Sequence, residues 1–254
     1  MTTPLTVWRE TEGRLLRLRL SRPKANLIDA EMIAALDRAF AEHGGNAHIA
    51  AILLEAEGPH FSFGASVEEH LPDQCAAMLA GLHGLVLRMV ESPIPVLAAV
   101  RGQCLGGGLE VALAAHLMFV AADATLGQPE MKLGVFAPAA SCLLPELIGP
   151  ARALDLLVSG RNLSGADAAA IGIAKVAGDP EKAALDYVAE HLMPKSASSL
   201  RFAVQAARFD FAARVRAKLA AVERLYLDEL MKSRDALEGL QAFIAKRPAK
   251  WEHC

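Results

Sequence analysis

Three consecutive glycines, Gly106-Gly107-Gly108, stand between two apolar stretches and constrain the fold more than any other feature of the chain. The stretch Val96–Val100 is short, apolar and preceded by prolines, which predicts a buried strand. The residues after the glycines, 109–115, are mostly good helix formers. The sequence therefore predicts a strand that passes through a glycine turn into a helix.

Such a turn is suited to a negatively charged oxygen. Without Cβ atoms the backbone approaches a ligand closely, and the first N–H groups of a helix lack internal partners and carry the positive end of its dipole. Glu110 falls in the first helical turn, where the dipole favours the ionised carboxylate and hence a base. Two alternatives stay open: glycines that serve packing alone, and a phosphate cradle. The glycines form neither the nucleotide-binding G-x-x-x-x-G-K-[ST] nor G-x-G-x-x-G, and Glu110 stands where phosphate would lie.

A second carboxylate follows in Gly127-Gln128-Pro129-Glu130. Pro129 restricts the residue before it to an extended conformation, so we expect Glu130 on a fixed loop. The intervening chain is long enough to bring Glu130 back beside Glu110. Taken alone, a glutamate at this position is usually an exposed loop residue without a role, and it is the pairing with Glu110 that indicates a site.

A third segment lies after the apolar strand predicted at Ala50–Glu55. It reads Pro59-His60-Phe61-Ser62-Phe63-Gly64-Ala65-Ser66, with Gly64-Ala65 at a tight turn. A backbone N–H of this turn is a candidate second donor beside the glycine triplet. An ordinary turn without a binding role stays open here.

The remaining patterns predict an α/β fold. Residues 15–20 alternate toward their end as a half-buried strand does, Asp29 is placed to cap a helix running through Phe40, and an α-rich tail begins after Ser159. Further elements are predicted as a helix at 78–90, strands at 117–120 and 174–176, and helices at 183–192, 196–209, 215–231 and 235–246.

Composition excludes several classes. The 254 residues are 53% hydrophobic with a mean hydropathy of +0.28, which excludes a disordered chain. The two stretches richest in apolar residues, Ile94–Val100 and Val111–Val120, are both shorter than the ~18–20 residues that a membrane-spanning helix needs. The net charge of −3 gives no overall positive potential that would attract the phosphates of nucleic acid. Residues 1–4 do not resemble the start of a secretory signal. The four cysteines form no C-x-x-C and the eight histidines no H-E-x-x-H, so we expect no metal site and a reduced, cytoplasmic protein.

Five fragments in register resemble the enoyl-CoA hydratase/isomerase (crotonase) superfamily. They are Leu20–Asn26, Phe61–Ala65, Val100–Glu110, Gly127–Gly134 and Gly239–Pro248. The resemblance implies a spiral of ββα units over residues 1–195, which binds acyl-CoA, and a helical trimerisation region over 196–254. It also implies a homotrimer or a dimer of trimers, no cofactor beyond the CoA of the substrate, and no nucleic acid or membrane partner.

The resemblance assigns site residues by motif. The N–H groups of Ala65 and Gly107 would hold the thioester oxygen, Lys24 and Ala25 would line the CoA nucleotide, and Lys246 would lie near the CoA phosphates. Family members with both glutamates are typically hydratases, which need a base for water and an acid for carbon. We assign Glu110 as the base and Glu130 as the acid, with a division of roles through one shared water left open.

One departure from the family pattern bears on the substrate. Residues 135–144, Val-Phe-Ala-Pro-Ala-Ala-Ser-Cys-Leu-Leu, replace the glycine-rich segment of most hydratases. This segment, with Phe63–His70, looks most like the cyclohexa-1,5-diene-1-carbonyl-CoA hydratases of anaerobic aromatic degradation. The resemblance thus implies a ring-shaped pocket lined by Phe63, Ser66, Val67 and Phe136.

Other functions remain open at this stage. A general enoyl-CoA hydratase or isomerase and an acyl-CoA hydrolase are possible on the same scaffold. An RNA-binding relative is a non-enzyme alternative, for which the only support is the basic run within 201–218. A serine protease lacks support, because no G-x-S-x-G surrounds Ser66 and no histidine is assignable as its base.

Overall fold

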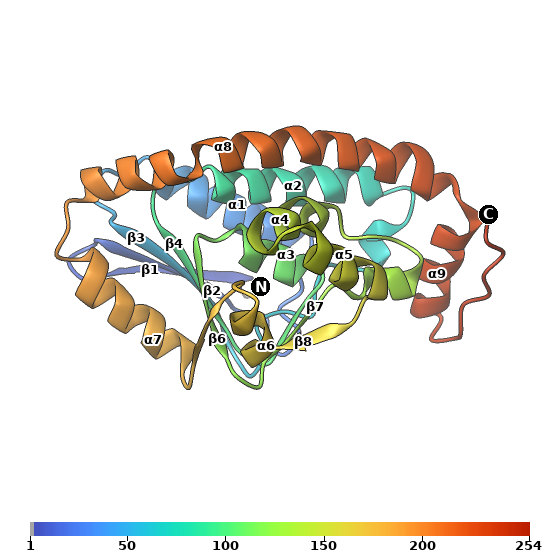
Figure 1. Ribbon diagram of the computed structural model, residues 1–254, viewed down its shortest axis with the longest axis horizontal. Helices are drawn as coiled ribbons and strands as arrows, with labels where there is room; N and C mark the ends of the chain where they lie inside the picture. Colours follow the sequence, from blue (N-terminus) through green and yellow to red (C-terminus); the bar gives the residue numbers. More distant parts are fainter. Residues whose placement is uncertain (1–2) are drawn as a thin grey trace.

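The computed structural model describes residues 3–254 and is built on a six-stranded sheet with the order β1-β2-β3-β4-β6-β9 (Figure 1). Only β1 runs antiparallel to its neighbour. Apolar runs form the central strands because helices cover both faces of this sheet. The strands are β1 (Leu5–Glu10), β2 (Leu15–Leu20), β3 (Ala51–Ala56), β4 (Val96–Val100), β6 (Leu117–Ala121) and β9 (Lys175–Ala177).

A smaller sheet holds β5 (Gln103–Leu105), β7 (Thr125–Gly127) and β8 (Asn162–Ser164). The chain repeats a unit in which a strand of the large sheet is followed by a strand of the small sheet and then by a helix. Thus β4 and β5 lead into α3 (Gly107–Ala114), and β6 and β7 lead into the short 3-10 helix η2 (Pro129–Leu133) and α4 (Pro138–Ile148). A bridge between Ser62 and Cys104 adds the preceding turn of chain to the small sheet. The expected spiral of ββα units is confirmed.

Alternating residues of the large sheet face two helical layers. Residues such as Ile52, Leu54 and Ala98 join the main core under α1 (Ala30–Gly44) and α2 (Cys75–Val90), while Leu53 and Leu97 pack against α7 (Pro180–Tyr187) and the turn after it, η3 (Val188–Leu192). As predicted, Asp29 caps α1, and its side chain accepts a hydrogen bond from the Met32 N–H.

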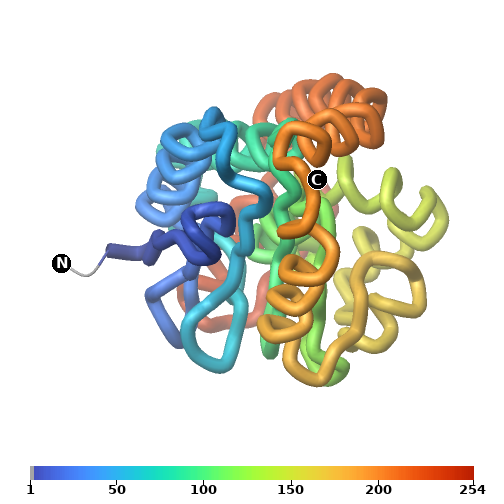
Figure 2. Tube along the Cα trace, turned by 90° about the vertical axis from the view of Figure 1, so that its left-hand side faces the viewer, coloured from blue at the N-terminus to red at the C-terminus, as the bar shows by residue number. Residues whose placement is uncertain are grey.

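The tail differs from its prediction. The helices expected at 196–209 and 215–231 are one helix, α8 (Ala197–Arg224), followed by the turns η4 (Leu225–Glu229) and η5 (Leu230–Lys232) and by α9 (Arg234–Ile244). No glycine or proline interrupts 197–224, so nothing in the chain ends the helix earlier. Figures 1 and 2 both show α8 across the top of the molecule and α7 below it.

Several elements were not predicted, among them the three short strands β5, β7 and β8 and four longer elements. The longer elements are β1, α4, α5 (Pro150–Ser159) and α6 (Gly165–Ala170). Within residues 3–254, no helix has the length and apolar character that a membrane crossing requires. The division at 195/196 falls between η3 and α8 and stays a prediction.

Candidate active site

The parallel pairing of β5 and β7 brings the two predicted acids together. Leu105 is opposite Gly127, so both strands end at one edge of the small sheet, where α3 and η2 begin. The two backbones are close, because a Cβ on Gly106 would lie 2.7 Å from Glu130 Oε1. Gly106 also has a φ of +48°, which glycine adopts without strain.

A cavity of about 580 Å³ opens over this edge. Most of the site residues predicted from the sequence line this cavity. Those that line it are Glu110, Glu130, Ala65, Gly107, Phe63, Ser66, Val67 and Phe136.

Lys24, Ala25 and Lys246, which are predicted to bind CoA, lie outside the cavity lining, and Ala25 and Lys246 are each hydrogen-bonded to a residue within it. The carbonyl of Ala25 accepts a hydrogen bond from the Phe63 N–H at 2.9 Å, and the Lys246 N–H donates to the carbonyl of Phe243 at 3.0 Å. Both Phe63 and Phe243 line the cavity. Lys24, next to Ala25, is exposed. Contact of these residues with CoA stays a prediction.

Two backbone N–H groups meet at the cavity without acceptors. The Ser62 segment lies along β5, with the Leu105 N–H donating to the carbonyl of Ser62 at 3.1 Å. This pairing brings Ala65 against Gly107, where a Cβ on the glycine would be only 3.2 Å from the Ala65 nitrogen. In the part of the chain that the structure describes, neither the Ala65 nor the Gly107 N–H has a hydrogen-bond acceptor. The pair can therefore donate to one ligand oxygen.

Glu110 lies in the first turn of α3, as predicted, and is only 3% exposed. Its Oε1 accepts a hydrogen bond from the Ala140 N–H at 2.8 Å. Burial raises the pKa of Glu110, whereas the bond from Ala140 and the charge of His83 lower it. Burial has the larger effect, so the helix dipole expected from the sequence is not what dominates at this carboxyl.

Glu130 lies in η2 and not in a loop, so that prediction was wrong. Pro129 occupies the first helical position, where its fixed φ suits a helix and its missing N–H has no consequence. Burial, and then the charge of Glu110, raise the pKa of Glu130 to about 8. At neutral pH this carboxyl therefore holds a proton, as a general acid must.

Sequence reasoning missed Gln128. Its side chain is 3% exposed, and with its nitrogen turned to the carboxyl it donates to Glu130 Oε1 at 3.1 Å and to Oε2 at 3.2 Å. Gln128 thus fixes the orientation of Glu130. The position directly before Pro129-Glu130 was the only available signal, because the burial of Gln128 is not visible in the sequence.

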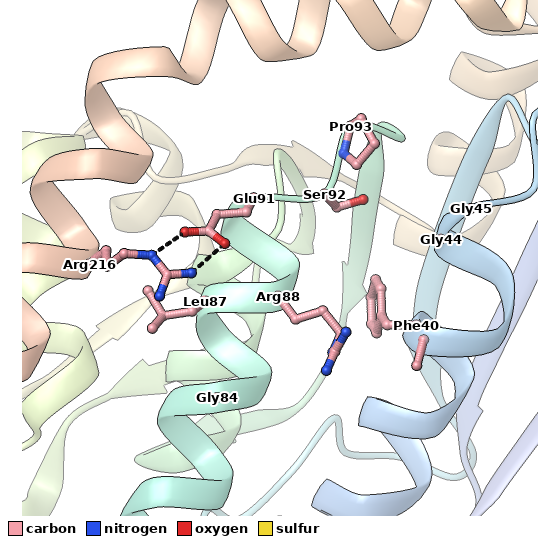
Figure 3. Close-up of a pocket in the computed structure, with 11 residues that line it drawn as sticks. Phe40, Gly44, Gly45, Gly84, Leu87, Arg88, Glu91, Ser92, Pro93 and Arg216 are labelled. Carbon is pink, nitrogen blue, oxygen red and sulfur yellow. Dashed lines mark hydrogen bonds and ion pairs between the residues drawn. The ribbon is translucent and has the colours of Figure 1, made fainter.

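A second hollow, of about 450 Å³, lies between α1 and α2 (Figure 3). Its cations already have partners: Arg216 donates to both oxygens of Glu91, at 2.7 and 2.6 Å, and Arg88 binds Asp37. Within residues 3–254, no three His, Cys, Asp or Glu side chains are grouped to hold a metal ion. The carboxyl pair is therefore the strongest site for chemistry.

Comparisons with known proteins agree with this geometry. Residues 10–253 match the family model described as enoyl-CoA hydratase/isomerase. The chain is 62% identical over 253 residues to cyclohexa-1,5-dienecarbonyl-CoA hydratase of Thauera aromatica, covering 99% of this chain and 98% of that one. It is 30% identical to a probable enoyl-CoA hydratase of Bacillus subtilis, covering 92% and 94%.

Solved structures are similar over the whole chain. The carnitinyl-CoA hydratase of Mycobacterium avium superposes with a TM-score of 0.86 at 27% identity, covering 100% of both chains. An enoyl-CoA hydratase/isomerase of Xanthobacter autotrophicus gives a TM-score of 0.83 at 26% identity, covering 97% and 98%. The fold, the family model and the relatives agree, and the chain belongs to the enoyl-CoA hydratase/isomerase family.

Proposed function

We propose that this chain adds water to a cyclic conjugated dienoyl-CoA thioester, with cyclohexa-1,5-diene-1-carbonyl-CoA as the substrate. The observation that carries the proposal is the pair of buried carboxyl groups beside two unused amide N–H groups in one cavity. The ring substrate is supported by the relative from Thauera aromatica, whose name states it.

The two amides act on the thioester oxygen. As water adds to the double bond, the carbonyl oxygen gains enolate character, and the N–H groups of Ala65 and Gly107 stabilise that charge. Because the backbone holds both donors in place, no reorganisation is needed during the reaction. One such donor contributes about 10²–10³ in rate, or about 2.7–4 kcal/mol.

The carboxyl pair divides the proton transfers. Burial raises the pKa of both carboxyl groups, but the charge of Glu110 raises the pKa of Glu130 further, so Glu110 is the group that ionises first. The backbone hydrogen bond from Ala140 also favours the ionised form of Glu110, which takes a proton from water. Glu130, with its pKa raised to about 8, donates a proton to carbon. Two neighbouring carboxyl groups whose surroundings differ are the usual basis of such an assignment.

The cavity wall suits an uncharged ring. Phe63 and Phe136 line it, and Phe136 is fixed edge-to-face on Tyr226 with 5.2 Å between ring centroids. Further apolar lining comes from Val67, Leu79, Leu82 and Val135. An apolar wall of this kind distinguishes substrates by the shape of the acyl group, and each methylene group by which two substrates differ changes the transition-state binding free energy by about 1–3 kcal/mol.

Lys24, Ala25 and Lys246 would contact the CoA moiety at the mouth of the cavity, and no cofactor beyond CoA would be required. A homotrimer or a dimer of trimers is the assembly that we propose, in the cytoplasm.

A substrate panel tests the proposal. Hydration of cyclohexa-1,5-diene-1-carbonyl-CoA, cyclohexenoyl-CoA and crotonyl-CoA is followed by the absorbance of the conjugated thioester. We expect the highest kcat/KM with the cyclic diene. A preference for crotonyl-CoA would overturn the ring substrate, and release of free CoA would indicate a hydrolase.

A further inference from the structure

The C-terminal tail, residues 248–254, turns back along α9 and lies beside that helix at one end of the molecule (Figure 1). The tail has neither helix nor strand. Its last residue reaches the start of α9, where the Arg234 N–H donates to the carbonyl of Cys254 at 3.1 Å. Because the tail has no regular structure of its own, its contacts with α9 determine where it lies.

Two carboxyl groups of α9 hold the tail on either side of Trp251. Before this residue, the Lys250 N–H donates to Glu238 Oε1 at 2.8 Å. After it, the N–H groups of the next two residues donate to the two oxygens of Asp235, at 2.7 and 2.8 Å. The backbone of Trp251 is therefore fixed from both directions, which leaves its indole ring little freedom to move.

The indole ring lies against two glycines that are far apart in the sequence. A Cβ on Gly134, at the end of η2, would be 3.0 Å from Trp251 Cζ3, and a Cβ on Gly239 of α9 would be 3.0 Å from Cη2. Both atoms belong to the six-membered ring of the indole. The ring thus occupies the space that a side chain at either glycine would need.

The same glycines bring the backbones of α9 and η2 into direct contact. A Cβ on Gly239 would lie 2.0 Å from the carbonyl oxygen of Leu133, and a Cβ on Gly134 would lie 2.7 Å from that of Asp235. A side chain at either position would push the two elements apart. Trp251 therefore covers a junction that depends on close packing.

This junction is directly connected to Glu130. The Gly134 N–H donates to the carbonyl of Met131 at 3.3 Å, and the Val135 N–H donates to that of Glu130 at 3.2 Å, so η2 and the turn after it form one unit. At the other side of this unit, Glu130 Oε1 lies close to Gly106. A displacement of the turn from α9 would consequently displace the Glu130 carboxyl from its place at the cavity.

We propose that Trp251 is a positioning residue, which locks the end of η2 against α9 and so holds the Glu130 carboxyl beside Gly106. The proposal rests on the proposed function, because Glu130 is the acid of that reaction. Trp251 does not line the cavity, so it acts through η2 and not by contact with the substrate. The site would thereby extend to the last residues of the chain.

Steady-state kinetics of Trp251→Ala test the proposal. The variant leaves the space between the two glycines empty, and a misplacement of about 1 Å at a catalytic group can lower the rate about 10²-fold. We expect kcat to fall about 10- to 100-fold with little change in KM, because the cavity lining is intact. Trp251→Phe keeps a six-membered ring at this place and should retain most of the wild-type kcat.

Trp8→Ala is the matched control, since it removes the other tryptophan of the chain. Trp8 lies on β1, where its Nε1 donates to Glu10 at 2.8 Å and its ring lies 4.9 Å from the guanidinium of Arg17. Its loss should leave kcat at the wild-type value. A wild-type kcat in Trp251→Ala, or a change in KM alone, would overturn the proposal.

Hydrogen exchange of the free protein, followed by mass spectrometry, gives a readout without turnover. We expect the amides of residues 129–135 to exchange about tenfold faster in Trp251→Ala, with β3 and β4 unchanged. Unchanged exchange over 129–135 would overturn the proposal. If Trp251→Ala does not fold, Asp235→Ala, which removes two acceptors of the tail, is judged by the same two criteria. Failure of the wild type to hydrate the cyclic ester counts against the proposed substrate alone, because the exchange is measured without substrate.

Discussion

Two buried glutamates of this chain have opposite surroundings. Glu55, on β3, is 1% exposed and binds the guanidinium groups of Arg17 and Arg19. Glu110 is 3% exposed, but its hydrogen bond comes from a backbone N–H, and a second carboxyl lies beside it. Burial is the same at both positions, and the partners differ.

The difference separates a structural cluster from a chemical site. Arg17 also binds Glu10 and Glu181, so the cluster on the large sheet matches each charge with an opposite one. The carboxyl pair has no guanidinium partner among residues 3–254, and it faces a cavity with two unused amides. A buried carboxyl group that can transfer a proton is therefore distinguished by the lack of a cationic partner, more than by its burial.

The largest expected effect is on turnover. Glu110→Gln keeps the shape of the side chain but removes the base, so we expect kcat to fall by about 10²–10⁴ with little change in ester binding. Glu130→Gln should behave alike. The measurement is steady-state hydration with the cyclic dienoyl ester. Turnover near the wild-type value in either variant contradicts the two-carboxyl mechanism.

Glu55→Gln should show the converse. Removing the buried partner Glu55 leaves Arg17 with only the more exposed Glu10 and Glu181, so we expect a loss of unfolding free energy below the roughly 3–5 kcal/mol of a fully uncompensated buried charge. Chemical denaturation measures this loss. Activity per folded molecule should stay unchanged, and a selective loss of kcat would mean that the cluster belongs to the site.

Gly107→Ala tests the amide pair. Its Cβ would lie 3.1 Å from the Ala65 Cβ and 3.2 Å from the Ala65 nitrogen, so the two segments must separate. We expect kcat to fall about 10²-fold, as for the loss of one oxyanion donor. Gly84→Ala is a control, since its Cβ meets nothing within 4 Å. Equal kinetics in both variants would exclude the amide pair.

The smallest effect is on pH dependence. Glu130 must be protonated to act, so kcat/KM should decline as the pH rises through about 8. The raised pKa also means that the folded state binds more protons than the unfolded state between the usual value of 4.5 and about 8. The unfolding free energy should therefore fall over that interval, and Glu130→Gln should remove this fall. A flat profile in the wild type would contradict the neutral acid.

The sequence predicted the strand β4 and the helix α3 that carries Glu110, because local patterns determine them, whereas η2, which carries Glu130, was expected as a loop. The apolar strand, the glycine triplet and the N-cap Asp29 act within a few residues. The missed helix α4 contains Pro145, which argues against a helix interior, and β8 has only three residues, too few for a pattern.

The missed polar residues depend on tertiary contacts. Gln128 matters because it is buried against Glu130, and burial is not visible in the chain. His83 is a single histidine in an apolar helix, and its partner Glu223 is distant in the sequence. No spacing rule joins such residues. The fold and the main site could therefore be predicted from the chain, but the shell around the site could not.

Hydration in H₂¹⁸O, followed by mass spectrometry of the acyl product, tests the central claim most directly. We predict one ¹⁸O atom on a ring carbon of an intact CoA ester in the wild type, and no label in Glu110→Gln over the same time. Label in a free carboxylate, with release of CoA, would contradict the account.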